Sequence, residues 1–112
     1  MKTTTTADER KKFSYQGDTK SGVTLLFDSK AIELPSELFD AVIRNYANKT
    51  VLGGFNEIEP PEQGLAIFMH NYARTELNKH VPIRCASHLC AILRDEGLVT
   101  LDKDCSAITV TF

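Results

Sequence analysis

The sequence predicts a single α+β domain in which a small antiparallel sheet packs against three helices. The chain has 112 residues, which fits one domain of the usual size of about 100–150 residues. Its 42% apolar and 25% charged residues are typical of a globular protein. Short strand-like segments lie at both ends, and helical periodicity fills the middle. The expected order is therefore β-β-β-α-α-α-β-β, in one domain spanning 1–112.

The N-terminal third is expected to supply three strands. Residues 1–11 are polar and predict a flexible tail. Phe13 and Tyr15 then alternate with polar residues, and the turn-forming cluster 17–22 separates them from the apolar segment 23–27. A tight turn at 28–30 leads into a third strand at 31–34. Because these connections are short, antiparallel pairing is favoured.

Three helices are expected to follow. The first begins after Pro35, with Ser36 as its N-cap and an apolar face at i, i+3, i+4 and i+7. The second is predicted over about 61–78, with a buried stripe of Leu65, Phe68, Met69 and Tyr72. The third is predicted over 82–96 and ends at Gly97, a residue that readily adopts the left-handed conformation. Its inward face is Ala86, Leu89, Cys90 and Leu93, and its outward face is Arg84, Ser87, His88, Ala91, Arg94 and Asp95.

The last segment predicts a β-hairpin. Residues 98–101 and 107–112 read as two strands around a polar turn. The N-terminal strands and this hairpin are expected to form one antiparallel sheet or two small ones, with the helices on the apolar side. No internal repeat or linker interrupts this pattern.

The distribution of charge singles out one stretch. The net charge is −2, which argues against a protein that binds nucleic acid or anionic membranes over its whole surface. Between Leu77 and Arg94, however, there is no acidic side chain. The same stretch contains five basic or histidine side chains: Lys79, His80, Arg84, His88 and Arg94.

The termini and the cysteines indicate a cytoplasmic protein. The N-terminus lacks the apolar segment of a signal peptide, and no apolar run reaches the roughly 20 residues needed to cross a bilayer. The three cysteines, an odd number, are typical of reduced thiols. No membrane association is expected.

The segment 87–101, together with 107–111, resembles the last helix and wing of winged-helix DNA-binding domains. In both, an amphipathic helix ends in a Glu-Gly-Leu-Val-like stop and passes into a two-stranded wing. The resemblance implies a small DNA-binding regulator that uses the 82–96 helix and the 98–112 wing. Arg84, Ser87, His88 and Arg94 would face the groove, while Lys79, His80 and Lys103 would contact the DNA backbone.

The patterns for a metal site, a catalytic site or a phosphate loop are weaker. Cys85 and His88 lie one helical turn apart, but no second pair completes a metal site, and nothing beside them matches a catalytic signature. Gly53-Gly54 follows a helix and precedes acidic residues, which is the wrong order for a phosphate loop. We therefore predict a non-enzyme without metal or cofactor.

The alternative function is a protein–protein interaction module: an inhibitor, an adaptor or an oligomeric accessory factor. The loop 53–61 carries Phe55 and Ile58 among acids and prolines, and loops often hold recognition residues. These two side chains either pin the loop to the core or contact a protein partner. A homodimer is compatible with either function, because two-fold dimers are the commonest assembly.

Overall fold

The N-terminal sheet has four antiparallel strands in chain order. They are β1 (Lys2–Thr5), β2 (Lys12–Asp18), β3 (Gly22–Leu26) and β4 (Ala31–Leu34). The computed structural model describes residues 1–55, 63–104 and 107–112, without the side chain of Asp104. Tyr15, Val23, Leu25 and Leu34 point from this sheet into the core, as their alternation with polar residues predicts.

The tail expected at 1–11 is instead partly a strand. Residues 2–5 pair with residues 12–15, and Thr6 and Ala7 are buried. The backbone N–H of Ala7 lies 3.0 Å from the Ser87 hydroxyl and 3.2 Å from the Ser87 carbonyl oxygen. Four consecutive threonines read as polar, but their β-branched side chains suit a strand.

Three helices and a second sheet follow. The helices are α1 (Ser36–Asn45), α2 (Leu65–Glu76) and α3 (Cys85–Asp95). The second sheet joins β5 (Thr50–Leu52), β6 (Thr100–Asp104) and β7 (Ala107–Thr111) in the order β5-β7-β6, all antiparallel. The α+β class and the three helices are confirmed. The strand β5 lies between α1 and α2, where the expected order has no strand.

The helix ends follow their local chemistry. Residue Gly97 has φ +76°, and the N–H groups of Gly97 and Leu98 bond the carbonyls of Arg94 and Leu93 at 3.0 and 2.9 Å. This is the Schellman pattern predicted from the glycine. At α1, by contrast, Pro35 occupies the N-cap position without a side-chain bond, so the predicted Ser36 cap is wrong.

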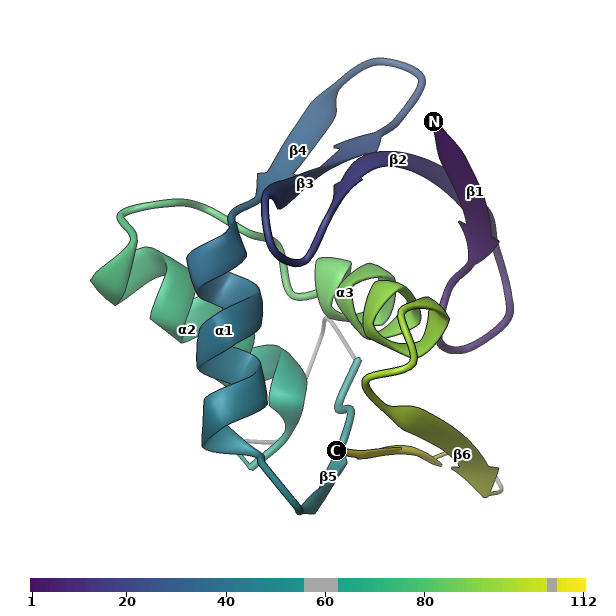
Figure 1. Cartoon of the computed structure of the whole chain (residues 1–112), viewed down its shortest axis with the longest axis vertical. Coiled ribbons are helices and arrows are strands. Elements are labelled where there is room, and N and C mark those ends of the chain that lie inside the picture. Colours follow the sequence, from purple (N-terminus) through teal and green to yellow (C-terminus); the bar gives the residue numbers. More distant parts are fainter. Residues whose placement is uncertain (56–62, 105–106) are drawn as a thin grey trace.

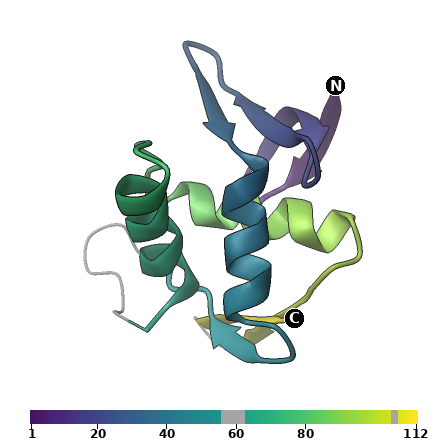
Figure 2. The same ribbon diagram turned by 60° about the vertical axis from the view of Figure 1, so that its left-hand side comes forward.

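Helix α3 lies between the two sheets. Figure 1 shows the N-terminal sheet on one side of α3 and the smaller sheet on the other, and Figure 2 shows α3 running across α1. The radius of gyration is 12.7 Å, as expected for one compact domain of about 100 residues. The largest fully buried side chains come from all of these layers: Phe39, Leu25, Leu34, Leu38, Leu65, Met69, Leu89, Ile92, Leu93, Val42, Val81 and Val110.

Candidate functional site

The outward face predicted for α3 is largely covered. Ser87 and Ala91, both expected to face outward, are 5% and 0% exposed. The N-terminal sheet and the segment that follows β1 pack on this face, and Ala7 bonds Ser87 as described above. The expectation that these two residues face outward is therefore wrong, because a second apolar layer lies on the helix, and Ser87, a groove-facing candidate, is not open to DNA. The inward residues Ala86, Leu89, Cys90 and Leu93 are buried as predicted.

Arg94 serves as a clamp between α3 and β1. Its guanidinium donates to the Thr4 hydroxyl at 3.1 Å and to the Thr5 carbonyl at 2.9 Å. It also pairs with the Asp95 carboxylate at 3.2 Å. A guanidinium with its donors engaged in this way holds the first strand in place.

His88 is sandwiched by aromatic rings. It is half-buried, with its ring 4.6 Å from Phe13 and 5.6 Å from Phe27 in edge-on geometry, and its Nδ1 lies 3.2 Å from the Arg84 carbonyl. Burial is the main cause that lowers the pKa of His88, and the nearby Arg84 charge lowers it further. The backbone bond and the Asp8 charge oppose this shift.

The lowered pKa of His88 predicts a loss of stability in mild acid. In the unfolded chain the imidazole of His88 takes up a proton near pH ~6.5, whereas in the folded chain it does so only at lower pH. The free energy of unfolding should thus have its full value above pH ~6.5. It should fall below that pH until His88 in the folded protein is protonated as well. Urea melts at about pH 7.5 and about pH 5.5 measure the drop. His88→Gln should shrink the drop, and an equal drop in the wild-type protein and in His88→Gln would contradict this origin.

The remaining basic candidates lie in three places. Lys79 is exposed and pairs with Glu33 of β4 at 3.3 Å. His80 and Arg84 are exposed and share a pocket of about 280 Å³ with His70, Pro82 and Ile83. Lys103 is exposed on β6, beyond the opposite end of α3, a helix about 16 Å long at 1.5 Å per residue. The structure thus joins His80 with Arg84 and separates both from Lys103.

His70 is a pocket residue that the sequence did not single out for DNA binding. Its Nδ1 lies 2.8 Å from the Val81 carbonyl oxygen, and its ring packs edge-on against His80 at 5.8 Å. Because a carbonyl only accepts, Nδ1 must carry a proton, and Nε2 is the atom left to meet a ligand. No Asp or Glu lines this pocket within the described chain.

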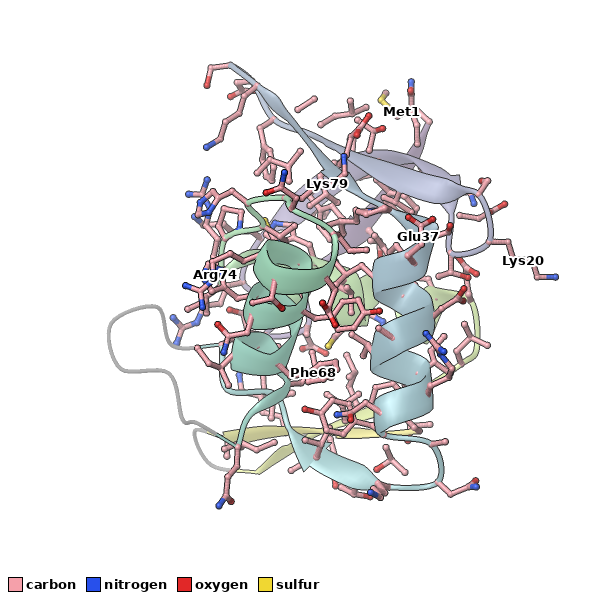
Figure 3. All side chains as sticks on the ribbon, turned by 90° about the vertical axis from the view of Figure 1, so that its left-hand side faces the viewer. Met1, Lys20, Glu37, Phe68, Arg74 and Lys79 are labelled. Atoms are coloured by element: carbon pink, nitrogen blue, oxygen red, sulfur yellow. The ribbon has the colours of Figure 1, made fainter. Side chains whose placement is uncertain are left out.

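A second surface lies between α1 and α2. A groove of about 430 Å³ is lined by Tyr46, Gln63, Ile67, Phe68, Asn71, Tyr72, Thr75 and Glu76. Phe68 and Tyr72 were predicted to be buried, but they are half-buried and line this groove, whereas Leu65 and Met69 are fully buried. Figure 3 looks onto this side of the molecule, with Phe68 at the lower part of α2 and Arg74 on the side of α2 away from α1.

The predicted protein-contact loop is only partly described. The ring of Phe55 packs on the core and lies against Gly53, where an added Cβ would stand 2.6 Å from it. Phe55 thus pins the chain to the core. Ile58 lies outside the described residues.

Metal and thiol chemistry have little support in the described chain. Within residues 1–55, 63–104 and 107–112, no cluster of three His, Cys, Asp or Glu side chains could hold an ion. Cys85 and Cys90 are buried, and burial raises the pKa of the Cys90 thiol, which disfavours the reactive thiolate. None of the described helices is long and apolar enough to cross a bilayer.

Comparison with known proteins gives no indication of function, so the inference of function rests on the surfaces described above. No family model matches the chain, and neither a curated protein nor a solved structure gives a significant match.

Proposed function

We propose that this chain is a non-catalytic nucleic-acid-binding domain that contacts the phosphate backbone through the His70–His80–Arg84 pocket. The observation that carries the proposal is the convergence of two imidazoles and one guanidinium in a pocket with no described acid in its lining. Arg donates strong hydrogen bonds to phosphate oxygens. The Nε2 of His70 donates as well only when the ring carries a second proton, because Nδ1 holds the first against Val81. Binding of this kind positions a duplex without reading its sequence.

The chain order supports a link to DNA. From Ser36 onward the elements run α1, β5, α2, α3, β6, β7, and β5 pairs with the last strand. Within this order, α3 followed by β6 and β7 corresponds to the helix and wing of the winged-helix domains that the C-terminal segment resembles. Since the N-terminal sheet covers the middle of α3, we place the contact at the exposed N-terminal end of that helix, around Arg84. Arg74 of α2 adds a further exposed cation.

The test is a titration with a random-sequence duplex at two salt concentrations. If two or three phosphates are neutralised, log K should fall with log salt with a slope of about −2 to −3. Arg84→Ala should weaken binding and flatten the slope by about 1. A matched variant on α1, Arg44→Ala, removes another exposed cation and should leave the affinity and the slope unchanged.

Two results would contradict the proposal. One is the absence of binding at low salt, and the other is an unchanged slope in Arg84→Ala. Lys103→Ala separates this geometry from the wing contact that the resemblance implies. A slope flattened by Lys103→Ala and not by Arg84→Ala would place the contact on the hairpin.

Protein binding is the second candidate function. The observation that favours it is the row of half-exposed aromatic rings in the α1–α2 groove, because exposed apolar patches rimmed by polar residues mark interaction sites.

A further inference from the structure

Three aromatic rings that line the α1–α2 groove, those of Tyr46, Phe68 and Tyr72, form with the neighbouring Phe112 a continuous aromatic ladder. Ring centroids are separated by 5.7 Å between Phe112 and Tyr46, by 5.5 Å between Tyr46 and Phe68, and by 5.9 Å between Phe68 and Tyr72. All four rings are half-buried, so the ladder is anchored in the domain and also open to solvent. Tyr and Phe side chains are enriched in protein–protein interfaces, and Tyr is also enriched in binding hot spots.

The rim of the groove has a defined electrostatic character. Among the described residues that line it, Glu76 is the one acidic or basic side chain, and Gln63, Asn71 and Thr75 supply neutral polar groups. Arg74, the nearest basic residue in the sequence, donates to the Asn71 side chain at 3.3 Å and does not line the groove. The faces of aromatic rings carry negative electrostatic potential, as does a carboxylate, so both attract cations.

We propose that this groove binds a basic, partly apolar peptide segment of a partner protein. An arginine or lysine of the partner stacks on the faces of Tyr46, Phe68 or Tyr72 and pairs with the Glu76 carboxylate. Apolar side chains beside it pack on Ile67 and on the exposed part of the ladder. A nucleic-acid strand fits less well, because its phosphates would meet Glu76 and, among the lining residues that the structure describes, no cation. This site is separate from the proposed phosphate pocket and does not depend on it.

The experiment titrates the isotope-labelled protein with three synthetic probes and follows backbone amide shifts by NMR. The probes are a blocked hexapeptide of alternating arginine and leucine, the same peptide with glutamate in place of arginine, and a short oligothymidylate. The arginine peptide should shift the amides of Asn71, Tyr72, Thr75 and Glu76, with β1 amides unmoved. The glutamate peptide and the oligonucleotide should leave the groove amides in place.

Two variants and a control locate the contact. Tyr72→Ala should weaken the arginine peptide by at least about fivefold, the loss expected for an aromatic anchor. Glu76→Gln, at an exposed position, should weaken it about threefold. Glu37→Gln removes a carboxylate near the other end of α1, where Figure 3 labels it, and should have no effect. Glu76→Gln keeps the test valid even if Tyr72→Ala does not fold.

Several outcomes would overturn the proposal. These are equal binding of the arginine and glutamate peptides, and no groove shifts at millimolar arginine peptide. Groove shifts caused by the oligonucleotide would reassign the ladder as a base-stacking platform. Dilution-dependent groove shifts without any probe would identify a second copy of the chain as the occupant. Loss of duplex binding in Arg84→Ala bears only on the phosphate pocket and leaves these readouts unaffected.

Discussion

Ala91→Arg is expected to destabilise the domain by on the order of 4 kcal/mol, enough to unfold much of the protein. Ala91 is completely buried on α3 and belongs to the core. An arginine there would overpack a layer already filled by the N-terminal sheet and would bury an unpaired charge. A urea melt followed by circular dichroism measures the loss.

The matched control is Ala47→Arg. Ala47 is exposed just after α1, so the same substitution should change the free energy of unfolding by less than about 0.5 kcal/mol. The comparison also discriminates between two views of α3. If its outward face read a DNA groove, Ala91→Arg would stay folded and would bind a duplex more tightly. A stable, tighter-binding variant would contradict the buried arrangement of α3.

Helix α3 shows what periodicity could and could not predict. The inward residues Leu89 and Leu93 follow from helical spacing, and both are buried. Ser87 and Ala91 were assigned outward because a small or polar residue at helical spacing reads as solvent-facing. Small side chains also allow another element to approach a helix closely, and here the segment around Ala7 does so. One-dimensional spacing does not distinguish these cases when the covering element lies 80 residues away in the sequence.

The elements that sequence reasoning missed are held by non-local contacts. The strand β1 pairs through its backbone and through Arg94, and β5 has three residues held against β7. Neither is long or alternating enough to give a periodic signal. The same holds for the two surfaces. His70 and His80 come from α2 and the following loop, and their shared pocket depends on how α2 ends.

The sequence did not predict the aromatic groove, because the apolar stripe of α2 is wider than the part of the helix that is fully buried. Leu65, Met69 and Ala73 define the fully buried line of α2, with Ala66 beside them. Phe68 and Tyr72 lie next to that line and share its spacing, so composition alone places them in the core. A stripe with more apolar positions than one helix–helix contact requires is a usable signal for a second, partly exposed contact surface.

Gly17→Ala is expected to cost about 3 kcal/mol, because it combines backbone strain with a direct clash. Gly17 has φ +96°, and a Cβ there would stand 2.1 Å from the carbonyl oxygen of Gly22. These residues close the β2–β3 hairpin, in which Gly17 pairs with Val23 and Asp18 with Gly22. The clash is with backbone, so the end of the hairpin must open to relieve it.

Opening the end of the β2–β3 hairpin would also disturb its contact with the C-terminal end of α3. The Glu96 carboxylate accepts from the Thr19 backbone N–H at 3.0 Å and from its hydroxyl at 2.8 Å, so the hairpin turn is tied to the end of the helix. Gly97→Ala is the control: Gly97 also has positive φ, but an added Cβ would meet nothing within 4 Å. It should cost only about 1 kcal/mol, the penalty of the left-handed conformation. Equal losses of unfolding free energy in the two variants would mean that the positive φ alone, and not the clash with Gly22, makes glycine necessary at position 17.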